Sequence, residues 1–131
     1  VLQGTHNFTA SSGDTFKIAL YTNSSSLAAA TATYGDGTAT NEVSGSGYSA
    51  GGNTLTSVTP VADGTTAVCD FADTSWTSAT ITAYGALIYN SSESNKSVCV
   101  LNFGGDKTCT SGTFTIQFPT ADASNAILRL A

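Results

Sequence analysis

The segment from Ala79 to Phe103 constrains the fold of this chain more than any other part of the sequence. Two apolar runs, ATITAYGALIY and VCVLNF, flank the polar residues 90–97. Side chains alternate between the two faces of a strand, and both runs place apolar residues on both faces. We therefore expect a β-hairpin with a sheet, a loop or a partner chain on each side. For Tyr84, Ala86 and Ile88 we expect either the opposite sheet of a sandwich or a neighbouring subunit.

Strict alternation divides the first run into two sets of side chains. One face is expected to carry Ile81, Ala83, Gly85, Leu87 and Tyr89. The other is expected to carry Thr80, Thr82, Tyr84, Ala86 and Ile88, and it becomes apolar in its second half. Because these apolar side chains are unfavourable in water, the second face must also be covered.

The rest of the chain favours strands over helices. Charged residues make up 10% of the 131 residues, against about 25% in an average globular domain. Thr, Ser, Asn and Gly take their place, and these residues are weak helix formers. Further strands are predicted at Thr15–Thr22, Leu55–Val61, Ala67–Phe71, Thr113–Phe118 and Ala126–Leu130, with a loop or weak edge strand at Tyr34–Thr40.

About eight strands at this spacing indicate an all-β fold, a single-domain antiparallel β-sandwich of jelly-roll-like topology spanning residues 1–131. Residues 1–8 are expected to form an extended or short helical arm. Turns are predicted at Asp73–Ser75 and Gly104–Asp106. Trp76 is expected to fill the core, and Tyr48 to anchor the Gly-rich tract Asn41–Asn53.

Charge and cysteine content narrow the classes of function. The net charge is −5, and the basic residues Lys17, Lys96, Lys107 and Arg129 are scattered, so nucleic-acid binding is not expected. No stretch is apolar and long enough to predict a membrane partner. Three cysteines without short spacing, Cys69, Cys99 and Cys109, favour free thiols in a reducing compartment and give no zinc pattern. A Cys99–Cys109 bridge stays open.

No catalytic, cofactor-binding or metal-binding residue is predicted. His6 is the single histidine, no nucleophile motif accompanies it, and it is expected to be a solvated loop residue. Asp70 and Asp73 stand three residues apart and are interpreted as structural, since such a spacing in a strand separates their side chains. Gly104–Thr108 lacks the glycine directly before lysine that a P-loop needs. Weak calcium binding at one loop stays an alternative.

Several segments, in order, resemble a family of small structural proteins of tailed bacteriophages. They are HNF followed by DTFKIALYT, NEVSGSGYSAGG, DTSW, GALIYN and GTFTIQFPTADASNAILRL, together spanning about Gly4 to Leu130. The resemblance implies a non-enzymatic virion protein assembled in the host cytoplasm. We expect a capsid decoration (cement) protein on the capsid surface, which binds the major capsid protein shell and stabilises the head.

Two alternatives remain: a tail or head-fibre component, and a carbohydrate-binding adhesin module. A surface on which sugar rings stack would be formed by some of the aromatic residues Tyr21, Tyr34, Tyr48, Trp76, Tyr84 and Tyr89. For the decoration protein the expected partners are the major capsid protein and further copies of the chain, as a homotrimer. The residues predicted to form the interface are Leu2, Phe8, Val43, Tyr48, Leu128 and Leu130.

Overall fold

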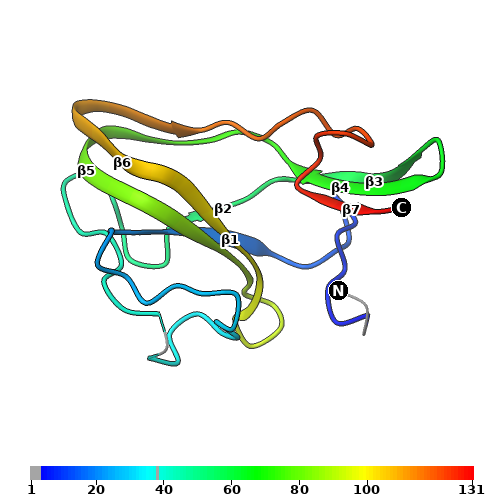
Figure 1. The fold of residues 1–131 in the computed structure, drawn as a ribbon, viewed down its shortest axis with the longest axis horizontal. Helices are drawn as coiled ribbons and strands as arrows, with labels where there is room; N and C mark the ends of the chain where they lie inside the picture. Colours follow the sequence, from blue (N-terminus) through cyan, green and yellow to red (C-terminus); the bar gives the residue numbers. More distant parts are fainter. Residues whose placement is uncertain (1–3, 38) are drawn as a thin grey trace.

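The computed structural model describes residues 4–37 and 39–131, and Figure 1 shows their fold. In these residues the chain forms no helix and seven strands: β1 (Phe16–Tyr21), β2 (Asn53–Thr54), β3 (Ser57–Asp63), β4 (Thr66–Phe71), β5 (Thr74–Asn90), β6 (Lys96–Ile116) and β7 (Leu128–Leu130). They form two antiparallel sheets, ordered β2-β1-β5-β6 and β3-β4-β7. The prediction of an all-β, sandwich-like fold is confirmed, and the jelly-roll topology stays a prediction.

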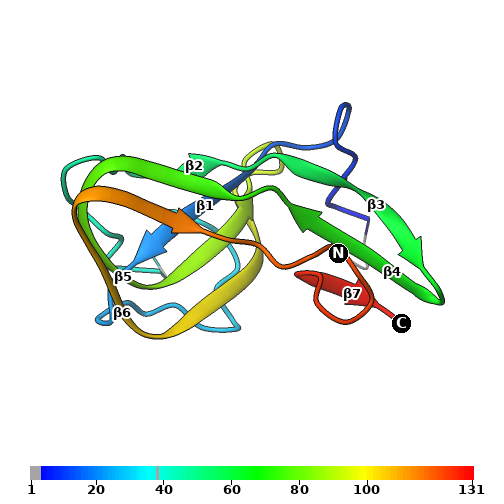
Figure 2. The ribbon, with the colours of Figure 1, turned by 90° about the horizontal axis from the view of Figure 1, so that it is seen from above.

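The central hairpin is confirmed and is longer than expected. β5 has 17 residues and β6 has 21, and they pair from Thr74–Ile116 to Asn90–Lys96. The turn predicted at Asp73–Ser75 is wrong, because Thr74 and Ser75 already begin β5. Instead of the separate strand predicted at Thr113–Phe118, residues Thr113 to Ile116 form the end of β6, drawn in orange in Figure 2, and Gln117 and Phe118 lie beyond it.

The turn predicted at Gly104–Asp106 is also wrong, because these residues lie inside β6. The pairing passes from Gly85–Asn102 to Ala83–Lys107, so residues 103–106 face Tyr84 alone. Gly104 and Gly105 take positive φ values of 71° and 159°, which only glycine adopts without strain. The strand therefore bulges and bends without reversing direction.

This irregularity also changes which residues share a face of β5. Ile81 and Ala83 lie in the main core, but beyond Gly85 the main core receives Ala86 and Ile88 instead. Leu87 and Tyr89 then lie in a second cluster on the other face. The predicted division into odd and even positions is therefore wrong, because a one-residue shift in register exchanges the two faces of a strand.

The second cluster is covered by an irregular segment of the same chain. Leu27, Tyr34 and Ala39 from the segment after β1 pack against it, and the Tyr34 ring stacks on Tyr89 with 4.4 Å between ring centres. Figure 1 shows this segment, in light blue and cyan, beneath β1 and β5. A loop of the same chain is therefore the cover of this face, which is one of the covers expected for such a strand. Ala86 and Ile88, for which an opposing sheet or a neighbouring subunit was expected, lie in the main core together with Phe71 of the second sheet. Over its described residues, the segment 34–40 forms no strand.

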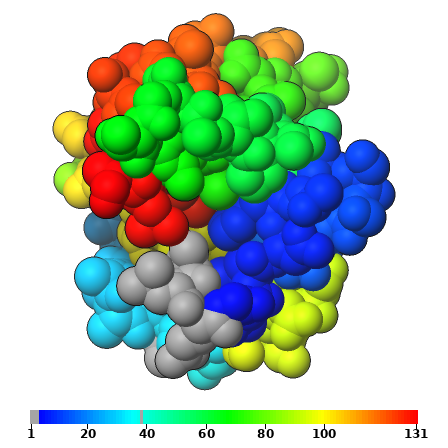
Figure 3. All heavy atoms as spheres, turned by 90° about the vertical axis from the view of Figure 1, so that its right-hand side faces the viewer, coloured from blue at the N-terminus to red at the C-terminus, as the bar shows by residue number. Residues whose placement is uncertain are grey.

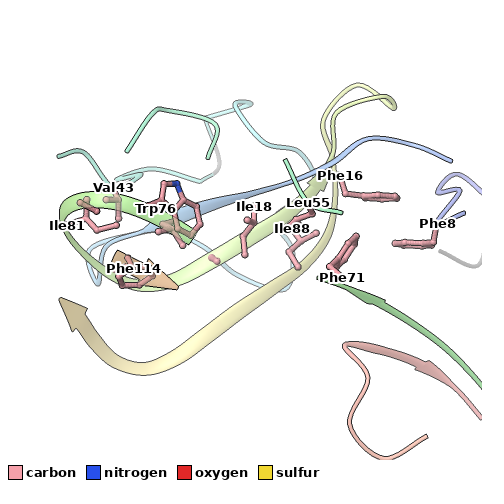
Figure 4. Packing of buried hydrophobic residues seen from close by; sticks show 14 residues of the cluster. Phe8, Phe16, Ile18, Val43, Leu55, Phe71, Trp76, Ile81, Ile88 and Phe114 are labelled. Atoms are coloured by element: carbon pink, nitrogen blue, oxygen red, sulfur yellow. The ribbon is translucent and has the colours of Figure 1, made fainter. Parts of the chain in front are cut away.

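The main core extends from Trp76 and Phe114 to Phe16 and Phe8, and it includes Phe71 of the second sheet (Figure 4). At one end Trp76, which is 4% exposed, meets Phe114 edge to face, as expected of a core residue. At the other end Phe8 stacks on Phe16. Phe16 in turn lies 5.5 Å from Phe71 of the second sheet, ring centre to ring centre.

The smaller elements differ from prediction in detail. β3 extends past Pro60, where the pairing with β4 shifts register; an edge strand tolerates proline at such an irregularity. β7 is shorter than the predicted Ala126–Leu130. Residues 4–8 contain no helix, and Leu2 lies outside the described residues. The described part of the chain contains no helix long and apolar enough to cross a membrane.

Replacing Leu87 by aspartate should unfold the protein. Leu87 is 0% exposed, and an unpaired carboxylate there should lower the free energy of unfolding by more than about 3 kcal/mol. Urea denaturation measures the change. Thr113→Asp on exposed β6 is the matched control and should change stability by less than about 0.5 kcal/mol. A stable Leu87→Asp protein would show that the hairpin is not central to the fold.

Candidate functional site

The bend in the hairpin leaves one side of the molecule open. Beyond the bulge, the end of β6 lies across from its beginning (Figure 1). Between them is a groove of about 540 Å³. Its lining, which we call the β6 groove, comprises Leu101, Asn102, Phe103, Lys107, Phe114, Thr115, Ile116, Gln117, Phe118, Pro119 and Ile127.

The groove is apolar and only partly covered. Leu101, Phe103, Ile116, Phe118 and Ile127 all pack against the main core but keep part of their surface exposed. β6 is also the edge strand of its sheet, so it has backbone groups that face no further strand there. An edge strand beside exposed apolar side chains is a typical docking site for another polypeptide segment.

The opposite side of the sandwich is closed by the Gly-rich segment. β2 pairs with β1, and Ser46 forms an isolated bridge with Thr80 of β5. Gly52 lies so close to β1 that an added Cβ would overlap the carbonyl oxygen of Ile18. Within the four-stranded sheet, the apolar surface of the β1–β2 side is thus covered, while the β6 side keeps the partly exposed residues of the groove.

The carboxylates of Asp70 and Asp73, which the sequence analysis interpreted as structural, accept backbone hydrogen bonds. Asp73 accepts a hydrogen bond from the Phe118 N–H at 2.8 Å, which holds one wall of the β6 groove against the start of β5. Asp70 is 2% exposed and accepts the Phe71 N–H at 2.8 Å. Burial raises the pKa of Asp70, although backbone N–H donors oppose the shift. The structural interpretation of both residues agrees with these bonds.

A cluster of tyrosines around Glu42 anchors the Gly-rich segment. Glu42 accepts hydrogen bonds from the hydroxyls of Tyr34 at 2.9 Å and Tyr48 at 2.7 Å, and from the Gly51 N–H at 2.7 Å. The Tyr48 oxygen also accepts the Leu20 N–H at 2.9 Å, which confirms its predicted anchoring role. Burial and the bond to Glu42 raise the pKa of Tyr34 to about 12, and the pKa of Tyr48 further.

These tyrosines are therefore neutral donors with a structural task, and we find no general base among them. The sequence analysis missed Glu42. A single acidic residue within the Gly-rich tract Asn41–Asn53, in a chain with so few charges, was the available signal.

His6 is not the solvated loop residue that the sequence predicted. Its Nδ1 lies 3.0 Å from the Nδ2 of Asn90, at the end of β5. Its ring is near Phe8 and Phe16, with 6.1 and 6.2 Å between ring centres. Burial is the main reason why the pKa of His6 is lowered. The Asn90 side chain is itself 0% exposed, so this contact ties the beginning of the chain to the hairpin.

The structure separates the residues predicted to form an interface. Phe8 and Val43 are 7% and 4% exposed and lie in the main core. Tyr48 and Leu128 are half-buried and pack against it. Leu130 is 52% exposed. Contact of these residues with another chain stays a prediction, and the β6 groove, which has no residue in common with them, was missed.

The cysteines and acidic residues offer no obvious reactive centre. The described thiols of Cys69, Cys99 and Cys109 are free, and burial raises the pKa of Cys99 to about 11, which makes it a poor nucleophile at neutral pH. Within residues 4–37 and 39–131, no three His, Cys, Asp or Glu side chains gather where they could hold a metal ion.

The chain matches no family model, no curated protein and no solved structure. Inferences about its function therefore rest on its own residues and on the geometry described above.

Removing the carboxylate of Glu42 should loosen the Gly-rich segment. Glu42→Ala leaves two tyrosine hydroxyls and one N–H without their acceptor, and should lower the free energy of unfolding by about 2 kcal/mol. Glu42→Gln keeps one oxygen and replaces the other by a donor that Tyr34 can accept, so its cost should be less than about 1 kcal/mol. Thermal and urea unfolding measure both; equal losses would contradict the anchoring role.

Proposed function

We propose that this chain is a non-enzymatic structural protein of a bacteriophage virion, which binds the shell of major capsid protein as a capsid decoration protein. The observation that carries the proposal is the β6 groove. Its apolar lining lies beside an edge strand, and that combination suits docking of a polypeptide better than turnover of a small molecule. Stabilising the head is the expected consequence of such docking.

The outer surface of the hairpin supports this role. Hydroxyl groups pair across the two strands, Ser75 with Thr115 at 2.8 Å and Thr82 with Thr108 at 2.9 Å. These pairs are uncharged, and the chain has only 13 charged Lys, Arg, Asp and Glu side chains, 4 basic and 9 acidic. A weakly charged surface has little electrostatic repulsion to overcome when it is packed against neighbours. The ordered resemblance to phage structural proteins points the same way.

The position in the virion follows from the same proposal. The chain would assemble in the host cytoplasm and occupy the capsid surface, as a homotrimer over capsomer junctions. Closed cyclic symmetry would let three copies present identical grooves to the shell. A tail or head-fibre position is the alternative within the same structural class.

Cryo-electron microscopy of virions made with and without this chain tests the position. The proposal expects density on the head surface to disappear when the chain is missing, and the heads to lose stability to heat. Loss of tail or fibre density from an otherwise unchanged head would contradict the capsid assignment.

A substitution in the β6 groove should weaken binding to the capsid without unfolding the protein. Phe103→Ser removes half-buried apolar surface from the groove and should weaken binding to undecorated heads at least tenfold, a change of about 1.4 kcal/mol. Val61→Ser on β3, where Val61 is 50% exposed, is the matched control and should bind normally. Co-sedimentation with heads measures both, after circular dichroism has confirmed folding. Normal binding of Phe103→Ser would exclude the groove.

A second candidate function, carbohydrate binding, rests on Tyr84. Its half-buried ring lines a small pocket of about 120 Å³ with the side chains of Asn23 and Asn102, and amide groups beside an aromatic ring are typical of sugar sites. Both amides are already engaged: Asn102 accepts the Gly104 N–H, and Asn23 donates to Asp106. Binding to a glycan array that Tyr84→Ala abolishes would favour this candidate over the structural role.

A further inference from the structure

The first described residues of the chain cover an aromatic cluster. We call residues 4–14 the N-terminal arm; Figure 3 shows it at the surface, in blue, beside the β3–β4 hairpin in green. Phe8 of the arm is 7% exposed and stacks on Phe16, with 4.6 Å between ring centres and 2° between ring planes. Its ring also lies 6.3 Å from that of Phe71. Without the arm, Phe16 and Phe71 would lose this cover (Figure 4).

Asn90 holds the arm through both hydrogens of its amide nitrogen. Nδ2 lies 2.7 Å from Oδ2 of Asp14 and 3.0 Å from Nδ1 of His6. The amide oxygen accepts the Ser92 N–H at 3.0 Å. These neighbours determine the orientation of the amide, because a flipped Asn90 would bring its oxygen against the Asp14 carboxylate and its NH₂ against the Ser92 donor.

The protonation state of His6 follows from this arrangement. An amide nitrogen donates and has no lone pair with which to accept a hydrogen bond. Nδ1 of His6 must therefore be the acceptor, so the ring is neutral and carries its hydrogen on Nε2. A second proton would have to bind at Nδ1, where it would point at the N–H of Asn90 and replace a hydrogen bond by two opposed donors.

We propose that His6 is a pH-sensitive latch, which holds the N-terminal arm over Phe16 and Phe71 while it is neutral and releases the arm when it is protonated. This device is independent of the β6 groove and goes beyond the proposed structural function. Opening the latch uncovers a second apolar surface, composed of the rings that Phe8 covers in the closed state.

The charged side chains around His6 shift its pKa in opposite directions. Burial lowers the pKa of His6 most, and Lys96 at the start of β6 lowers it further. Asp14 in the arm and Glu93 in the hairpin turn raise it, without reversing the direction. The folded-state pKa therefore lies below the unfolded value of about 6.5. The closed arm keeps its full stability above that value and loses it as the pH falls toward the folded-state pKa.

Nuclear magnetic resonance on the full chain tests the latch. The ring of His6 should titrate with a pKa below about 6.5. The amides of Asn7 and Asp14, which donate to Asp14 Oδ2 at 2.8 Å and to the Asn7 carbonyl at 2.8 Å, report closure through hydrogen exchange. From about pH 7.5 to about pH 5.5 their protection factors should fall, by at most roughly tenfold, while that of Val43, whose N–H donates to the Leu20 carbonyl, stays constant.

His6→Asn is the matched variant. Its side-chain oxygen lies near the place of Nδ1 and accepts from Asn90, but it does not titrate in this range. The variant should keep the arm protected at both pH values and bind no more apolar dye in mild acid, whereas the wild type should bind more. A His6 pKa at or above about 6.5 would overturn the latch. So would a constant protection factor in the wild type, or an equal loss in the variant.

Discussion

The pairing of β5 with β6, and the bend within it, determines the rest of the structure. Because residues 103–106 face Tyr84 alone, the two strands curve enough for one hairpin to contribute to both walls of the main core. β1 and β2 extend the sheet on the β5 side, where the Gly-rich segment closes the sandwich. In the part of the chain that the structure describes, no strand follows β6 in this sheet, so the same bend that forms the core also opens the groove.

The sequence analysis predicted those parts of the fold that depend on local alternation. Strands β1 and β4 were expected within a residue at each end, and the existence of the central hairpin was expected although its length was not, because apolar side chains recur there with a period of two. The bend could not be predicted in this way. Gly104–Gly105–Asp106 has the composition of a turn, and whether it reverses the chain or bulges depends on the register of a partner strand some twenty residues earlier.

The candidate site was harder to predict than the fold. Phe114, Ile116 and Phe118 alternate clearly, and this pattern correctly indicated side chains that face the core. It carried no sign that Ile116 and Phe118, and the side chains across the groove from them, would be left partly uncovered. The cover of Leu87 and Tyr89 was missed for a related reason, because an irregular segment with no periodicity supplies it. Polar contacts between distant residues, such as those of Glu42 and Asn90, leave almost no pattern in a single sequence.

The contact between His6 and Asn90 spans 84 positions of the chain, and this separation has a consequence for synthesis. A ribosome releases the N-terminal arm first and its binding site only after most of the domain has emerged. Phe8 and Phe16 must therefore remain without their final neighbours until the hairpin exists, and closing so long a loop is slow compared with local folding. The nascent chain thus carries a partly uncovered aromatic segment until β5 has emerged, and during that time the segment is open to other contacts.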